Sequence, residues 1–161
     1  MSMFTLKTTA LRVILLLLCT GAFFACSKPK TEADLVAESI TKIAEAVEAK
    51  DVKGAMKYVS VDFRGDDGSD RNNVKGILVG QLLNEDSISV FIRGVEVEVA
   101  GNKAAAHLRA VITRGRPVKS IKDIPRDSAD AFKFELILKK EDGLWKVVNA
   151  AYERVGLAGF L

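Results

Sequence analysis

The side chain best suited to acid–base chemistry is His107, the only histidine in the chain. A histidine held beside a carboxylate can act as an oriented general base. Hairpin geometry around the turn signal Gly101-Asn102 places His107 opposite Glu96, with Arg109 on the same face. That face points away from the expected core, where solvated cross-strand pairs are common. We therefore favour a surface contact over a catalytic role and predict no catalytic residue.

An acidic cluster surrounds Gly65 and Gly68, and it consists of Asp62, Asp66, Asp67 and Asp70. Calcium loops alternate their ligands as Asp-x-Asp-x-Asp-Gly and add a distal glutamate. The spacing here differs and no such glutamate follows. We interpret the cluster as a polar turn and predict no metal site and no cofactor.

A basic segment precedes the third long strand, with cations at Arg114, Arg116, Lys119, Lys122 and Arg126. Such a loop could contact an anionic lipid or glycan, but a solvated loop is the simpler interpretation.

Asn149 is the polar exception on an apolar face. Pairing Phe134, Leu136 and Leu138 with Ala151, Asn149 and Val147 turns its amide inward. A buried amide must form hydrogen bonds or stay wet, and a pocket would satisfy it. Three aromatic residues could line the same cavity, so the predicted ligand-binding set is Asn149, Trp145, Tyr58 and Phe132. A capped core amide or a shifted register are the alternatives.

The N-terminal segment has the layout of an export signal. Lys7 and Arg12 precede an apolar run that starts at Val13. The run is about 13 residues long, whereas a permanent transmembrane helix needs about 20. A cleaved signal peptide over residues 1–25 explains the segment better. Both cysteines lie within the first 26 residues, so the domain that follows has neither an internal disulfide nor a cysteine metal site.

Residues 23–26, Phe-Phe-Ala-Cys, resemble a lipobox, the site where a lipoprotein signal peptidase cuts before an acylated cysteine. The resemblance implies lipidation of Cys26 and anchoring in the cell envelope. Ser27 favours the outer membrane, facing the periplasm, if the organism is Gram-negative. An ordinary secretory signal or an uncleaved anchor are the alternatives. Residues 26–33 then form a polar tether, and 156–161 form a C-terminal tail that closes the cone or meets a partner.

Charge and composition limit the function of the remaining chain. The 161 residues are 48% hydrophobic and carry a formal charge of +3. Without Lys7 and Arg12, the mature part has 22 basic residues against 21 acidic ones. Nucleic-acid binding requires a concentrated basic surface, so this balance argues against it. The length fits one domain, expected over residues 34–155.

Apolar residues recur with helical spacing in the first half of the domain. Val36, Ile40, Ile43 and Val47 predict a helix that begins near Thr31. A second helix is expected from an Asp51 cap through Tyr58, and a third from Ser69 or Asp70 to Leu83.

After Asn84 the period changes to two, which predicts strands. Gly101-Asn102 predicts one hairpin that pairs Val99 with Ala104, Val97 with Ala106 and Val95 with Leu108. Gly94 indicates a bulge or bend, and Glu141-Asp142-Gly143 predicts a second hairpin. The fold class is therefore α+β, with N-terminal helices packed on a curved antiparallel sheet that forms a cone-like half-barrel.

The segment 60–63, Ser-Val-Asp-Phe, and the segment 141–148, Glu-Asp-Gly-Leu-Trp-Lys-Val-Val, resemble those of the nuclear transport factor 2-like superfamily, which has a cystatin-like fold. The resemblance implies a pocket between sheet and helices, and dimerisation through the sheet. Enzymes of that superfamily rely on a buried carboxylic base. No acid matches it among the residues assigned inward.

We therefore favour a non-catalytic envelope lipoprotein whose cone pocket or sheet face binds a small apolar ligand or a protein partner. The alternative is an isomerase- or cyclase-like enzyme that uses Asp62, with Asn149 as a donor.

Overall fold

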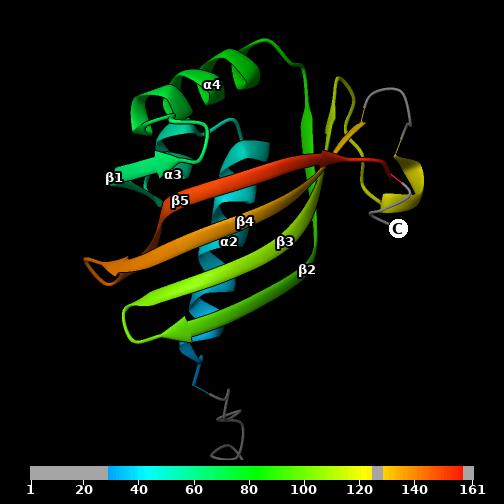
Figure 1. Ribbon diagram of the computed structural model, residues 1–161. Helices are drawn as coiled ribbons and strands as arrows, with labels where there is room; N and C mark the ends of the chain where they lie inside the picture. The colour runs from blue at the N-terminus through cyan, green and yellow to red at the C-terminus, as the bar shows by residue number, and fades with distance from the viewer. Residues whose placement is uncertain (1–28, 125–128, 158–161) are drawn as a thin grey trace, which may run out of the picture.

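The computed structural model describes residues 29–124 and 129–157. Three helices and a five-stranded sheet form two layers (Figure 1), and the strand order is β1-β5-β4-β3-β2. The expected signal peptide, Cys26, Arg126 and most of the expected tail lie outside the described residues. Within the described part, no helix combines the length and apolar character needed to cross a bilayer.

The helices begin close to the residues predicted from the sequence. Helix α2 spans Glu32–Glu48, and Thr31 and Asp34 cap its N-terminus reciprocally. Helix α4 spans Arg71–Leu83 after an Asp70 cap. Because α2 begins at Glu32, the last two residues of the expected tether belong to the helix.

Helix α3 spans Val52–Met56, so it ends before the predicted Tyr58. The chain turns instead into strand β1, Val59–Gly65, which the sequence analysis did not predict. Strand β1 pairs in parallel with β5 at the sheet edge, from Val59 opposite Val147 to Gly65 opposite Ala150. The correction shortens the helix and adds an edge strand.

Strands β2, Ile88–Ala100, and β3, Lys103–Arg114, form the first predicted hairpin. Val99 pairs with Ala104, and Val97 with Ala106, as predicted. The register shifts between Arg93 and Glu96, where Gly94 has a φ of 58°. This confirms the bulge at Gly94, but the shift removes the predicted pairing of Val95 with Leu108.

Strands β4, Ala129–Glu141, and β5, Leu144–Val155, form the second hairpin. Leu138 pairs with Val147, as predicted, but the register then shifts so that Ile137 faces Asn149. Val148 is the extra residue of this bulge. The predicted pairs of Leu136 with Asn149 and Phe134 with Ala151 are therefore wrong: Leu136 faces Ala150 and Phe134 faces Tyr152.

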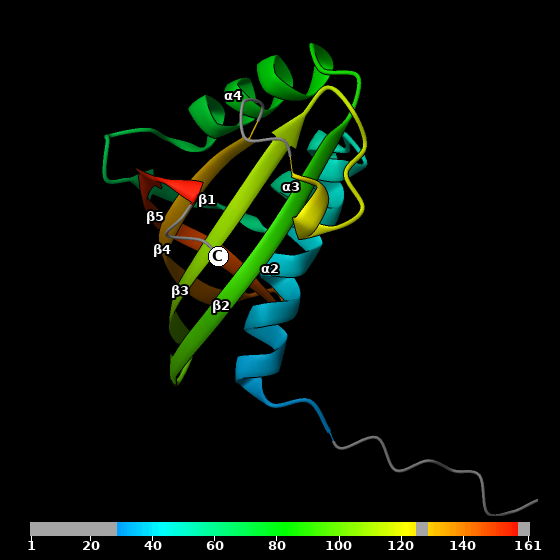
Figure 2. The same ribbon diagram turned by 90° about the vertical axis from the view of Figure 1, so that its right-hand side faces the viewer.

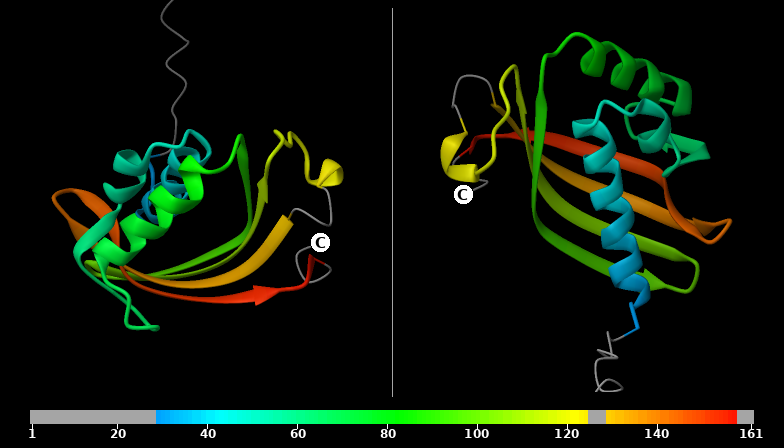
Figure 3. Two further views of the ribbon diagram at one scale, coloured as in Figure 1. Left: turned by 90° about the horizontal axis from the view of Figure 1, so that it is seen from above. Right: turned by 180° about the vertical axis from the view of Figure 1, so that it is seen from behind.

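The main core lies between α2 and the concave face of the curved sheet (Figure 3, left). Its buried residues include Val36, Leu138 and Trp145. Two of the residues expected inward, Val95 and Val99, are each 37% exposed. A smaller cluster around Val111 and Ala131 lies on the opposite face, where the 3-10 turn Ile121–Asp123 packs (Figure 2).

Strand β2 is the second edge of the sheet and is 13 residues long. Helix α2 packs against it, and Glu48 near the helix end accepts a hydrogen bond from the backbone N–H of Val90 at 2.7 Å. One outward-pointing donor of the edge is therefore occupied by a side chain of the same molecule.

Candidate binding face

The four residues predicted to bind a ligand do not meet at one point. Trp145 is 1% exposed, and its indole N–H donates to Glu32 at 2.9 Å. Tyr58 is half-buried, with the Lys57 ammonium 5.9 Å from its ring centre. Phe132 lies near the start of β4, among aromatic residues. The structure thus leaves Phe132 as the member of the set on an open part of the concave face.

The bulge at Val148 determines the position of Asn149. Asn149 pairs with Ile137, which lies on the outward face. Its amide nitrogen donates to the carbonyl of Arg64 at 2.7 Å and to Asp66 Oδ1 at 2.8 Å. The amide therefore joins β5 to the end of β1, which corresponds to the shifted register considered as an alternative from the sequence.

The same bulge brings an unpredicted aromatic residue onto the concave face. Tyr152 lies opposite Phe134, and Phe132 lies two residues from Phe134 on the same face. The ring centres are 5.9 Å apart for Phe132 and Phe134, 6.1 Å for Phe132 and Tyr152, and 6.2 Å for Phe134 and Tyr152. We call Phe132, Phe134 and Tyr152 the aromatic triad. Tyr152 remains 61% exposed, although Phe134 packs against the main core.

An ion cluster borders the aromatic triad. Asp130 pairs with Arg114 at 2.5 Å and also with Arg154, which lies opposite Phe132 on β5. The Asp130 side chain is 18% exposed, whereas that of Arg154 is 73% exposed. Hydrogen bonds between a carboxylate and guanidinium groups are charge-assisted and stronger than neutral ones. The arrangement is therefore suited to holding the strand ends together and leaves Arg154 accessible beside the rings.

His107 pairs with Glu96, as predicted, and its Nδ1 lies 4.0 Å from Glu135 Oε1. Glu96 and His107 line a depression of about 350 Å³ at the Gly94 bulge, on the outward face. His107 and Glu135 are each about half exposed. Both the exposure and the outward face agree with the surface interpretation.

The acidic residues around Gly65 do not meet at one site. Asp67 accepts from the Ser69 backbone N–H at 2.9 Å, and hydrogen bonds from Ser69 hold the pKa of Asp67 below its usual range. Asp70 caps α4, and Asp62 is exposed on β1. Among residues 29–124 and 129–157, no group of three His, Cys, Asp or Glu side chains is placed to hold a metal ion. In the basic segment, Arg114 pairs with Asp130, whereas Arg116, Lys119 and Lys122 are exposed.

The order of the elements and the curved sheet can be compared with solved structures. A candidate dehydratase of the NTF2-like family from Streptomyces avermitilis is 19% identical, with a TM-score of 0.62 over 80% of this chain and 99% of that chain. An NTF2-like protein from Cytophaga hutchinsonii is 13% identical, with a TM-score of 0.60 over 78% of this chain and all of that one. This chain has the NTF2-like, cystatin-like fold.

That fold carries more than one kind of function. A candidate scytalone dehydratase from Novosphingobium aromaticivorans is 12% identical, with a TM-score of 0.64 over 77% of this chain and 84% of that chain. No protein-family model matches the sequence, and no curated protein matches it. Because the identities are this low, the NTF2-like fold is shared but a function is not transferred.

Proposed function

We propose that the protein is a non-catalytic binding module of the cell envelope, anchored through lipid on Cys26. Its ligand is a small apolar molecule that lies on the aromatic triad of the concave face. The observation that carries this proposal is Tyr152, whose ring contacts Phe132 and Phe134 while the side chain stays 61% exposed.

A ligand on the triad would gain two contributions. Covering exposed aromatic surface is worth about 25 cal/mol per Å² removed from water. Offset or edge-on ring contacts add about 0.5–1.5 kcal/mol per pair. Three rings with centres near 6 Å form a rigid apolar floor, so little side-chain entropy is lost on binding.

The carboxylates support binding over catalysis. Among the residues that the structure describes, hydrogen bonds lower the pKa of four carboxyl groups, those of Glu32, Asp34, Glu38 and Asp67. A general base of the isomerase type instead needs a carboxyl group in an apolar pocket. Asp62, the acid of the enzymatic alternative, is exposed on the edge strand. Asp130, the acid nearest the triad, is paired with two arginines.

The binding proposal is tested with the neutral fluorescent probe N-phenyl-1-naphthylamine, titrated against the chain that carries Cys26→Ser. Adding Phe132→Ala and Tyr152→Ala removes two rings, and we expect Kd to rise about tenfold or more. Ile137→Ala is the matched control, because Ile137 is 40% exposed on the opposite face. Equal probe affinity in the double variant and the control would contradict the proposal.

The anchor has its own test. Cys26→Ser should move the protein from the membrane fraction to the soluble fraction, because the acyl chains can no longer attach. Mass spectrometry of the unaltered protein should show the acyl mass on Cys26. Membrane retention of the variant with no change in processing would rule out lipid anchoring.

A further inference from the structure

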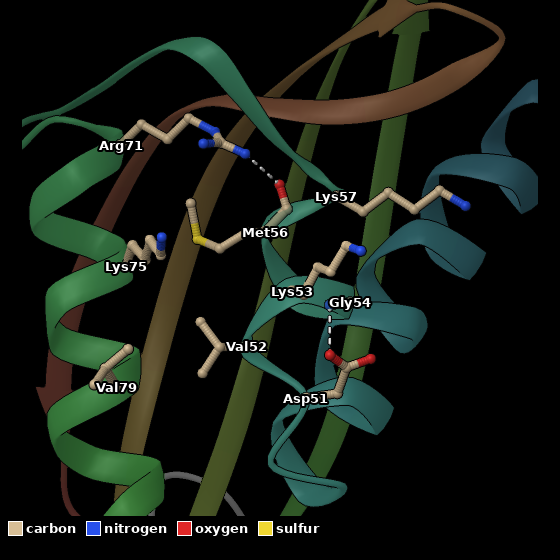
Figure 4. Close-up of a pocket in the computed structure, with 9 residues that line it drawn as sticks. All are labelled: Asp51, Val52, Lys53, Gly54, Met56, Lys57, Arg71, Lys75 and Val79. Carbon is tan, nitrogen blue, oxygen red and sulfur yellow. Dashed lines mark hydrogen bonds between the residues drawn. The ribbon is translucent and has the colours of Figure 1, made fainter.

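A second concave region lies among the helices, away from the aromatic triad. It is a groove of about 800 Å³ between α3 and α4 (Figure 4), which we call the helical groove. All of its lining residues belong to α3 and its flanks or to α4, and none belongs to a strand. Its volume lies within the range of about 300–1,000 Å³ that is usual for small-molecule sites.

The floor of the groove is apolar. Val52 and Met56 of α3 face Val79 of α4 across it (Figure 4). Met56 is almost fully buried, whereas Val79 is 37% exposed. Val79 lies on the side of α4 that borders the groove (Figure 4) and is not covered by another side chain of the helix pair. A thioether and two valines form a surface that accommodates an alkyl chain.

The rim of the groove carries cations in excess. Four basic residues line it, Lys53, Lys57, Arg71 and Lys75, against a single acid, Asp51. One oxygen of Asp51 is already used, because it caps α3 by accepting from the Gly54 N–H at 2.8 Å. The mature chain is close to neutral overall, so this local excess is a property of the groove and not of the whole surface.

The four cations differ in how far they are engaged. Arg71 donates to the carbonyls of Val59 and Met56, which fixes its guanidinium at one end of the groove. Lys57 extends away from α4, with its ammonium 5.9 Å from the Tyr58 ring centre. Within the described part of the chain, Lys53 and Lys75 form no ion pair. Figure 4 shows them on opposite helices, with Lys75 extending toward Met56 and Lys53 extending from α3 away from α4.

We propose that the helical groove binds a single-chain anionic amphiphile, such as a medium- or long-chain carboxylate. Its alkyl chain lies on Val52, Met56 and Val79. Its anionic head lies at the rim beside Lys75 and Arg71, where the charge of Lys53 adds to the positive potential. Charge complementarity selects this ligand: an apolar floor alone would accept any alkyl chain, but unpaired ammonium groups on the rim favour an anion. The site is separate from the aromatic triad and does not depend on the function proposed for it.

The position of the groove also favours a single molecule over a membrane surface. Helix α3 follows the C-terminal end of α2, whereas the chain enters α2 from the other end, about 25 Å away for 17 residues (Figure 1). With the lipid anchor proposed above, on which this step rests, the groove lies at the end of α2 opposite the tether. This position favours a dispersed ligand over one embedded in the membrane.

The test compares three probes of equal chain length on the Cys26→Ser chain: laurate, dodecanol and dodecyltrimethylammonium. The two ionic probes are used below their micellar concentrations, and dodecanol below its solubility limit. Calorimetry should show laurate bound one to one and at least about tenfold more tightly than the other two. The double variant Lys53→Gln, Lys75→Gln should raise the Kd for laurate about tenfold or more. The control pair is Lys103→Gln with Lys139→Gln, on paired strand positions far from the groove, and it should leave laurate binding unchanged.

Two further variants keep the result interpretable. Val79→Glu places a carboxylate on the floor and should reverse the preference from laurate to dodecyltrimethylammonium. Tyr152→Ala should leave laurate binding unchanged, and the groove variants should leave N-phenyl-1-naphthylamine binding unchanged. Three results would each overturn the assignment. The first is equal affinity for laurate and dodecanol, and the second is weaker laurate binding in the control pair. The third is laurate binding that is weakened by Tyr152→Ala but not by the lysine substitutions.

Discussion

The two ends of the curved sheet differ in what covers their concave face. At the hairpin end, Leu138 and Trp145 are buried beneath α2, and Trp145 donates to a helix side chain. At the other end, the rings of the aromatic triad lie on the same two strands, yet Tyr152 is mostly exposed. One pair of strands therefore supplies both a closed core and an open face. The closed end contributes buried core, whereas the open end leaves aromatic surface uncovered.

The largest expected effect is the difference in the free energy of unfolding between a variant at the closed end and one at the open end. Leu138→Ala removes a fully buried side chain and should lower the free energy of unfolding by about 2–5 kcal/mol. Tyr152→Ala should lower it by about 1 kcal/mol or less, because the ring is mostly solvated already. Urea denaturation followed by circular dichroism measures both. Similar losses in the two variants would mean that the open end is part of the core.

A smaller effect is expected at the first bulge. Gly94 has a φ of 58°, a conformation that costs a residue with a Cβ about 1–2 kcal/mol. A Cβ at this position would meet no atom within 4 Å, so Gly94→Ala should lose about that amount through backbone strain alone. Gly94→Asn should lose less, since asparagine tolerates this region. A neutral Gly94→Ala would indicate that the bulge relaxes without glycine.

In helix α4, replacing a glycine by alanine should stabilise the protein, whereas the same change at Gly94 should destabilise it. Gly76 lies in the helix, and a Cβ built there would meet no neighbour within 4 Å. Gly76→Ala should therefore stabilise the protein by about 0.4–1 kcal/mol, because the unfolded chain loses freedom and the helix gains propensity. Thermal unfolding measures the gain. A loss instead would show that α4 must bend at this position.

The smallest expected effect is a pH dependence of the stability that Glu32 contributes at the closed end. Hydrogen bonds from Lys140, and then from Trp145, lower the pKa of Glu32 from its ordinary value of 4.5. The contribution of Glu32 is therefore fully present above pH 4.5 and is lost as the pH falls through the lowered pKa. Glu32→Gln should lower Tm at pH 7, and the difference from the unaltered protein should shrink toward pH 3. A difference that is constant with pH would assign the effect to packing.

Local signals made much of this fold predictable. The helix starts were predicted near Thr31, at an Asp51 cap, and at Ser69 or Asp70. The structure has caps at Thr31, Asp51 and Asp70, where a side chain satisfies free N–H groups. Gly101-Asn102 and Asp142-Gly143 fixed two hairpins, and Gly94 marked its bulge because a positive φ there favours glycine. In each case the residues that determine the structure are adjacent in the sequence.

The features that the sequence analysis did not predict depend on contacts between segments far apart in the chain. Strand β1 is short and pairs in parallel with β5, more than eighty residues later. Because the two strands are not joined by a hairpin, no turn sequence between them could indicate the pairing. The bulge at Val148 has no glycine and is visible only through the pairing of β5 with its neighbours. That one residue moves Asn149 outward and Tyr152 inward. Phe132 was named from the sequence as a candidate pocket residue, but its contacts with Phe134 and Tyr152 were not predicted.

The hydrogen bond from Val90 to Glu48 affects how separate molecules meet. An edge strand of 13 residues offers unsatisfied backbone groups along which a strand from another copy can align. The carboxylate of Glu48 occupies one of these donors, and α2 packs beside it. An intermolecular β-sheet would first have to break this bond and leave an anion at the new junction, so the helix protects the protein against edge-to-edge aggregation.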